Sequence, residues 1–302
     1  MRRLLAAAAA GGLLLSGCGG TTGASDTSSP APSAPSGRSS AVSSSAGSSA
    51  GSSAGSLRSR AEQEAGASYS TWRLGAHPLP LRPDGYGQMR PTPPTLRVRR
   101  YRTTDLLPPP ADGRYHATIG PITPAIRERM GETWSSDCPV PLSGLRYLRM
   151  SFRGFDGLAH TGEMVVNATV AADVVSVFRK LFAAGFPIEE MRLPTTADVL
   201  AHPTGDGNNT AAMVCRPARG STVWSAHAYG LAIDLDPFDN PYQRGDVVLP
   251  ELASSYLDRS WVRPGMVEPG SVAVRAFASI GWSWGGDWTS LKDYEHFTET
   301  GR

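Results

Sequence analysis

The stretch Ser225-Ala-His-Ala-Tyr-Gly-Leu-Ala-Ile-Asp-Leu-Asp-Pro237 carries the pattern that decides the fold. Residues 231–236 alternate between large apolar side chains and small or acidic ones, which is typical of a half-buried strand. The face opposite the core carries two carboxylates beside a small side chain: Ala232, Asp234 and Asp236. Gly230 permits a turn just before this strand, so His227 is predicted to fold back toward Asp234.

A second cluster lies at the C-terminal end of the chain. The stretch Gly281-Trp-Ser-Trp-Gly-Gly-Asp-Trp288 leads to Asp293-Tyr-Glu-His-Phe297. A catalytic zinc site keeps three protein ligands and leaves one position for water. The predicted ligands are His227, Asp234 and His296. Asp293, three residues before the last of these, is the predicted general base that takes a proton from the attacking water.

The segments around these clusters predict an α+β domain. Residues 145–152 alternate as a strand does, and 162–167 form a second, shorter one. Residues 167–184 have apolar side chains at helical spacing, and a last helix is predicted over 271–280. We therefore expect a small antiparallel sheet with flanking helices that carry a mononuclear zinc site.

Composition divides the 302 residues into a polar N-terminal third and a folded remainder. Residues 19–66 are mostly Ser, Ala, Gly, Pro and Thr, and they predict a disordered tether because they cannot bury enough apolar surface. Residues 67–111 are rich in Pro and Arg. We expect this segment to be extended, and its sequence pattern indicates no particular fold. Residues 112–302 form the predicted folded domain. The net charge is +2 and the arginines are scattered, so the sequence has no basic patch of the kind that binds nucleic acids.

The first 18 residues predict an export signal. Two arginines precede an apolar run, Leu4 to Leu15, which is too short to span a membrane. Leu15-Ser-Gly-Cys18 resembles a bacterial lipobox, in which the Cys18 thiol is lipidated after cleavage. We expect an extracytoplasmic protein anchored by this lipid to the outer face of the cell membrane. A plain secretory signal is the alternative.

Two further cysteines remain, Cys138 and Cys215. In an oxidising compartment two such thiols often pair, which predicts a disulfide. Two free buried cysteines are the alternative. Neither lies in a CxxC pattern or near a histidine in sequence, so neither is predicted to bind zinc.

Taken together, these motifs resemble the M15 metallopeptidases. The matching stretches include Ser225-x-His-x-x-Gly-x-Ala-x-Asp234, Asn240-Pro-Tyr242 and the two C-terminal motifs quoted above. The resemblance implies zinc as the cofactor, the same three ligands, and Asp293 as the base. It also implies that Arg216 stabilises the oxyanion or binds a substrate carboxylate, and that Ser225 lines the site. The implied substrates are peptidoglycan stem peptides, and we expect a monomer.

The sequence leaves the cleaved bond open. A carboxypeptidase would remove the terminal D-alanine of a D-Ala–D-Ala pair and is the reading we favour. An endopeptidase would cut an internal bond such as L-Ala–D-Glu or a cross-bridge. A non-catalytic, wall-binding lipoprotein is the third possibility, although a complete ligand set together with Asp293 argues against it.

Overall fold

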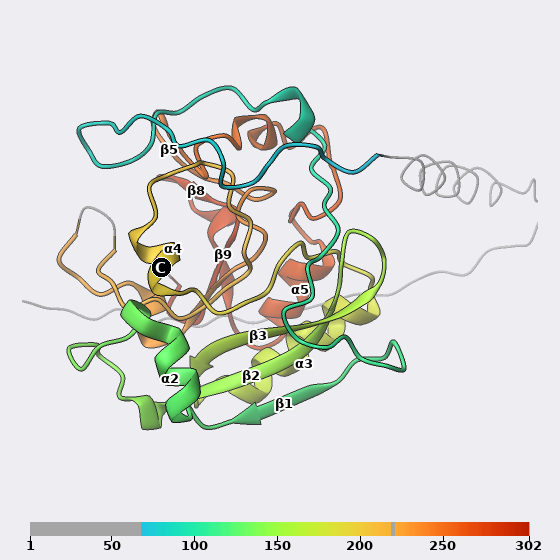
Figure 1. Ribbon diagram of the computed structural model, residues 1–302, viewed down its shortest axis with the longest axis vertical. Helices are drawn as coiled ribbons and strands as arrows, with labels where there is room; N and C mark the ends of the chain where they lie inside the picture. Colours follow the sequence, from blue (N-terminus) through green and yellow to red (C-terminus); the bar gives the residue numbers. More distant parts are fainter. Residues whose placement is uncertain (1–67, 219–220, 302) are drawn as a thin grey trace, which may run out of the picture. The chain divides into compact units, whose positions relative to one another are not determined.

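The two longest strands form one hairpin (Figure 1). The computed structural model describes residues 68–218 and 221–301, all within a unit that spans 61–302. β2 (Leu145–Arg153) pairs with β3 (Ala159–Asn167) in antiparallel register, and β1 (Ala117–Gly120) pairs with the other edge of β2. Both strands predicted in this region are confirmed.

The helices predicted from apolar spacing are also present. α3 (Ala171–Ala183) packs on the hairpin and buries one apolar stripe, which includes Val174, Val177, Phe178 and Leu181. α5 (Val272–Ala278) packs against α3 and begins at Ser271, whose hydroxyl accepts a hydrogen bond from the Val274 amide. These helices cover the first sheet with one shared core.

Two smaller antiparallel sheets carry the C-terminal half. One has the strand order β4-β9-β7, and the other has the order β6-β5-β8. Their bounds are β4 Ala232–Asp234, β9 His296–Thr298, β7 Ser283–Trp284, β6 Val247–Leu249, β5 Tyr242–Arg244 and β8 Lys292–Asp293. Phe277 of α5 stacks on Phe297 of β9 with ring centroids 4.0 Å apart. This contact joins the helical core to the second sheet.

The strand predicted over 231–236 is shorter than expected. β4 ends at Asp234, and Asp236 has a φ of 42°, in the left-handed region that ends a strand. Asp236 is fully buried, and its carboxylate accepts a hydrogen bond from the Glu189 amide. The alternation therefore holds for Asp234 and fails for Asp236, which turns into the interior.

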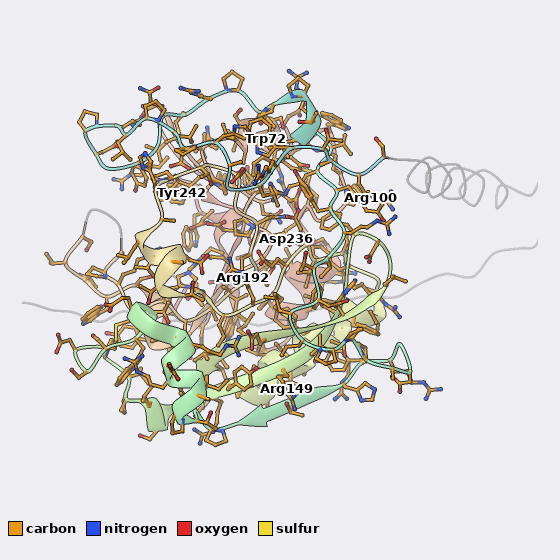
Figure 2. The ribbon with its side chains drawn as sticks, viewed as in Figure 1. Trp72, Arg100, Arg149, Arg192, Asp236 and Tyr242 are labelled. Atoms are coloured by element: carbon orange, nitrogen blue, oxygen red, sulfur yellow. A yellow bond between two sulfur atoms is a disulfide. The ribbon has the colours of Figure 1, made fainter. Side chains whose placement is uncertain are left out.

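The Pro- and Arg-rich segment packs on the rest of this unit. Leu79 and Leu96 are buried, and Trp72 donates its indole N–H to Asp206 at 2.8 Å (Figure 2). Arg99 is buried and forms two hydrogen bonds of 2.6 Å with Glu189. The described part of this segment contains turns and one short 3-10 helix, η1 (Pro94–Leu96), and it is an integral part of the folded unit.

Short helices complete the described chain. The α-helices are α2 (Pro124–Met130) and α4 (Thr196–Leu200). The 3-10 helices are η1 Pro94–Leu96, η2 Gly131–Thr133, η3 Leu142–Gly144, η4 Ala226–Tyr229, η5 Ser254–Leu257 and η6 Gly285–Asp287. No helix among the described residues has the length and apolarity needed to cross a membrane.

Candidate metal centre and active site

His227 lies in the short helix η4, just before strand β4. The Ser225 hydroxyl caps this helix and accepts a hydrogen bond from the His227 amide at 3.4 Å. Gly230 then reverses the chain with a φ of 66°, and a Cβ there would lie 2.6 Å from the Asn167 amide nitrogen. Glycine is therefore required for both its conformation and its size, and the turn brings His227 back over β4 as predicted.

The tautomer of His227 follows from one contact. Its Nδ1 lies 2.7 Å from the Ala212 carbonyl oxygen, which can only accept a hydrogen bond. Nδ1 therefore carries the proton, and in the neutral ring Nε2 offers a lone pair. That Nε2 lies 3.2 Å from Asp234 and 3.2 Å from Nδ1 of His296. His227 is thus oriented as a ligand.

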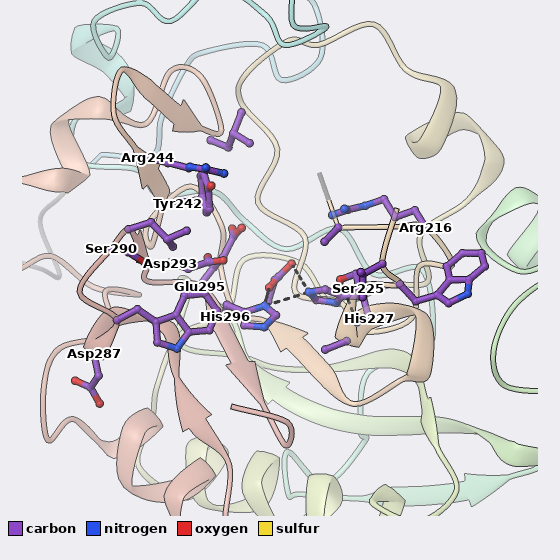
Figure 3. A pocket seen from close by; sticks show the side chains of 18 of the residues that line it. Arg216, Ser225, His227, Tyr242, Arg244, Asp287, Ser290, Asp293, Glu295 and His296 are labelled. Carbon is purple, nitrogen blue, oxygen red and sulfur yellow. Dashed lines mark hydrogen bonds and ion pairs between the residues drawn. The ribbon is translucent and has the colours of Figure 1, made fainter. Parts of the chain in front are cut away.

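Asp234 and His296 meet because their strands pair. They are directly opposite each other in the β4–β9 register, while the next pair, Ile233 and Phe297, is buried in the core. His296 Nδ1 lies 3.0 Å from the Asp234 carboxylate (Figure 3). Side chains directly opposite on paired strands point to the same face, so both residues project away from the core.

The three side chains fit a divalent metal ion of the zinc type. One ligand atom from each of His227, Asp234 and His296 lies within 4.8 Å of the others. Two imidazoles and one carboxylate form a common ligand set for catalytic zinc, which leaves a position for water. Both histidines are buried, whereas the Asp234 side chain is 25% exposed and lines the pocket.

Electrostatics keep these groups in the protonation states that a metal needs. Burial opposes ionisation of Asp234, but its contacts with His227 and then with His296 hold the pKa of its carboxyl well below the usual range. Burial lowers the pKa of His296, against the opposing influence of Asp234. The carboxylate is therefore ionised and His296 is neutral, which are the forms that bind metal.

Asp293 lies beside this group on strand β8. Burial raises the pKa of its carboxyl well above the usual range, the Asp234 charge raises it further, and Arg216 opposes the shift. Its Oδ1 is buried and has no hydrogen-bond partner among the described residues. A half-buried carboxyl beside the ligands, with one unpartnered oxygen, is suited to take up a proton.

The Trp-Gly-Gly part of the C-terminal motif supports Asp293. A Cβ on Gly285 would lie 2.5 Å from the Asp293 carbonyl oxygen, and one on Gly286 would lie 2.2 Å from the Trp284 ring. Trp284 also donates its indole N–H to the Tyr294 carbonyl at 2.8 Å. The two glycines therefore allow helix η6 to pack directly against the backbone that carries the base.

All six predicted residues of the catalytic site border one pocket of about 650 Å³: Arg216, Ser225, His227, Asp234, Asp293 and His296. Arg216 approaches from the side opposite Asp293 and points into the opening (Figure 3). Asp287 and Glu295 border the same pocket and are the other carboxylates that could act as the base. The structure thus places every residue of the predicted catalytic site around a single cavity.

Other pocket residues were not predicted as site residues. The opening is lined by Tyr242 and Arg244 on β5, by Trp288 after η6, and by Tyr86 of the Pro- and Arg-rich segment (residues 67–111). Tyr242 stands in a motif used for the family resemblance, and strand alternation from it would have pointed to Arg244. No sequence pattern predicted Tyr86, because it comes from the segment to which no fold was assigned.

Asp236 does not join the ligands, although the alternation of residues 231–236 placed it on the same face as Asp234. The His227 ring is instead oriented by the Ala212 carbonyl. Asp236 instead accepts from the Glu189 amide in the interior. The early end of β4 explains the difference.

Cys138 and Cys215 are joined by a disulfide, so the paired alternative is the one present in the structure. The Cys215 amide also donates to the Thr133 carbonyl at 2.9 Å, and Arg216 is the next residue. The disulfide thus anchors the base of the loop that brings Arg216 to the pocket. Cys18, the predicted lipidation site, lies outside the described residues, as does the predicted tether.

Comparison with known proteins identifies one family. Residues 219–299 match the family model described as D-alanyl-D-alanine carboxypeptidase, in its M15 group. The matched range holds the three candidate ligands, Ser225 and Asp293, and it begins after Arg216. Comparisons with curated proteins and with solved structures gave no match. Residues 219–299, which hold the three side chains that could bind a metal ion, are therefore similar to the M15 peptidase family.

Proposed function

We propose that this chain is a zinc-dependent peptidase that hydrolyses peptidoglycan stem peptides, with D-alanyl-D-alanine carboxypeptidase-like activity. The observation that carries the proposal is that two histidines and Asp234 converge in one pocket beside Asp293, whose Oδ1 is buried and has no partner among the described residues. The family match supports this substrate class. The open pocket has room for a peptide, because it is similar in volume to many ligand sites.

The residues would divide the reaction between them. His227, Asp234 and His296 would hold zinc, which supplies a Lewis acid and lowers the pKa of water. Asp293 accepts the proton of the attacking water and then donates it to the leaving amine. Arg216 stabilises the negative charge that develops on the carbonyl oxygen, since its guanidinium points into the pocket from the opposite side.

The test uses the full chain loaded with zinc and muropeptides that carry pentapeptide stems, with mass spectrometry of the products. Loss of one alanine indicates a carboxypeptidase, and an internal cut indicates an endopeptidase. Asp293→Asn should lower kcat by about 10²- to 10⁴-fold and leave the zinc content unchanged. Asp287→Asn is the matched control, because Asp287 borders the same pocket but is exposed.

A wild-type chain that binds one zinc ion and cleaves no stem peptide would overturn the enzymatic proposal. That outcome would favour a non-catalytic, wall-binding protein. Retained activity in Asp293→Asn would instead assign the base to another pocket carboxylate.

We further propose that Cys18 carries a lipid that anchors the chain at the outer face of the cell membrane. The support is the basic start, the short apolar run and the Leu-Ser-Gly-Cys motif. The test is metabolic labelling with a clickable fatty acid, followed by membrane fractionation of wild type and Cys18→Ala. Equal labelling of the two chains would contradict the assignment.

A further inference from the structure

A row of three pocket side chains runs along strands β5 and β8. Tyr242 and Arg244 are two residues apart on β5, so they project from the same face at about 7 Å spacing. Tyr242 is also directly opposite Asp293 in the β5–β8 register. All three line the pocket. The row therefore begins at the proposed base and ends at a cation farther from the metal group.

Tyr242 lies between the two charged ends of this row. Burial raises the pKa of its hydroxyl, Arg244 opposes that shift, and the Asp293 charge adds to it. The Arg244 side chain itself is exposed at the pocket opening. Within residues 68–218 and 221–301, no carboxylate forms an ion pair with Arg244. In contrast, Arg82, Arg99 and Arg192 are each paired with at least one carboxylate. Arg244 thus presents a charged guanidinium to whatever enters the pocket.

The hairpin that carries Arg244 is anchored on both sides. Arg82 of the Pro- and Arg-rich segment forms a 2.8 Å ion pair with Asp246, which lies in the turn between β5 and β6. The Val248 amide of β6 lies 3.3 Å from the Met89 sulfur. These contacts hold the hairpin in place, so Arg244 lies on a supported element, as a binding residue needs.

Arg216 and Arg244 project from opposite walls of the pocket and act at different places (Figure 3). Arg216 lies across the pocket from Asp293, on the side of Ser225 and His227. Arg244 lies two residues beyond Tyr242, which is directly opposite Asp293. With Arg216 assigned to the scissile carbonyl by the proposed function, Arg244 remains to bind a second anionic group of the substrate.

We propose that Arg244, together with the Tyr242 hydroxyl, binds the free α-carboxylate of the residue that follows the scissile bond. This inference rests on the proposed peptidase function and makes its substrate class specific: peptides that end one residue after the cleaved bond. A guanidinium fork matches a carboxylate in bidentate geometry, and a phenol hydroxyl adds a third donor. An internal peptide bond offers no carboxylate at this position, so the site selects for chain ends.

The experiment compares two synthetic stem peptides of identical sequence that end in D-Ala–D-Ala, one as the free acid and one as the C-terminal amide. Wild-type full chain loaded with zinc should cleave the acid with a kcat/KM about 10- to 100-fold above that of the amide, as expected for a charge-assisted hydrogen bond. Arg244→Gln should remove this preference by lowering only the rate for the acid. Arg149→Gln is the matched control, since Arg149 is an exposed strand arginine on β2 (Figure 2).

Binding provides a second readout that does not need turnover. In Asp293→Asn loaded with zinc, calorimetry should show tighter binding of the acid than of the amide. Adding Arg244→Gln should make the two affinities equal, while the urea midpoint of the chain stays unchanged.

The outcomes separate this inference from the function on which it rests. Equal cleavage of acid and amide by wild type, or an equal loss on both substrates in Arg244→Gln, would overturn the inference and leave the peptidase intact. Cleavage of neither peptide would overturn the proposed function. In that case an Arg244-dependent preference in binding would still support the carboxylate site, and equal binding would overturn it.

Discussion

Asp239 is a buried carboxyl whose pKa depends on its burial and on the charged groups around it. It is fully buried and close to two other buried acids, Asp236 and Glu189, and the buried Arg99 lies beside them. Burial raises the pKa of Asp239 to about 7, against the opposing influence of Arg99 and a hydrogen bond from Asn208. Two like charges in a low-dielectric interior are costly, so a proton is retained here instead.

This shift predicts a pH-dependent stability. The Asp239 pKa rises from 3.8 when unfolded to about 7 when folded, so the folded state binds more protons between these values. Its contribution to the free energy of unfolding is therefore largest below pH 4 and falls as the pH rises to about 7. Asp239→Asn should gain stability relative to wild type from pH 5 to pH 7.5, measured by urea unfolding. A difference between the two chains that does not change with pH would refute this assignment.

Sequence reasoning reached the candidate ligands because local patterns determine them. Alternation about Asp234 and the glycine turn after His227 place both residues without knowledge of distant contacts. It failed at Asp236, where a left-handed backbone and a hydrogen bond to Glu189 replace the strand. Those features depend on a partner 47 residues away, and no short-range pattern contains it.

Helix η6 and strand β8 form the element that sets the position of the base. Gly285→Ala would place a methyl group 2.5 Å from the Asp293 carbonyl oxygen, and backbone atoms cannot move aside as a flexible side chain can. We expect a stability loss of about 1–3 kcal/mol. We also expect kcat to fall by about 10²-fold, because β8 shifts relative to the ligands.

Unfolding curves and kinetics of the variant measure both effects. Gly120→Ala on β1 is the matched control, since no atom lies within 4 Å of its added methyl group. If Gly285→Ala retains full kcat, direct packing of η6 on β8 does not position Asp293.

The disulfide connects the loop before η3 to the loop that carries Arg216. It closes a sequence separation of 77 residues, so it restricts the unfolded chain strongly. The double variant Cys138→Ala/Cys215→Ala should lose about 2–4 kcal/mol in the free energy of unfolding. Denaturant unfolding without reductant measures the loss, and wild type in reductant should reproduce it. An unchanged midpoint in both would show that the bridge adds no stability.

At the scale of the whole molecule, the sequence correctly predicted the two hairpin strands and the helices α3 and α5, but it assigned no fold to residues 67–111. That segment has no helical or strand periodicity, so composition was the only guide. Its described part is held by single side chains with distant partners, such as Arg99 with Glu189, 90 residues away. Contacts of this kind are visible only once the rest of the chain has folded.

The same segment yields the last prediction. Removing residues 1–111 would leave Glu189 buried without Arg99. It would also remove Leu79 and Leu96 and expose the apolar side chains against which they pack, such as Phe238 and Tyr256. Loss of one partner from a buried ion pair alone costs about 3–5 kcal/mol. The shortened chain should therefore unfold at a much lower urea concentration than a chain that starts at residue 68.

Point variants separate the ion pair from the rest of the segment. Arg99→Met should destabilise the full chain by about 3–5 kcal/mol, and Arg99→Met/Glu189→Met should recover most of that loss, because no uncompensated charge remains buried. Arg149→Met, on an exposed strand position, should change stability by less than about 0.5 kcal/mol. If the chain that starts at residue 112 unfolded cooperatively at the wild-type midpoint, the segment would be an accessory to an independent domain. The buried Arg99–Glu189 pair and the buried Leu79 argue instead that this segment belongs to the folded unit, and Tyr86 makes it part of the pocket wall.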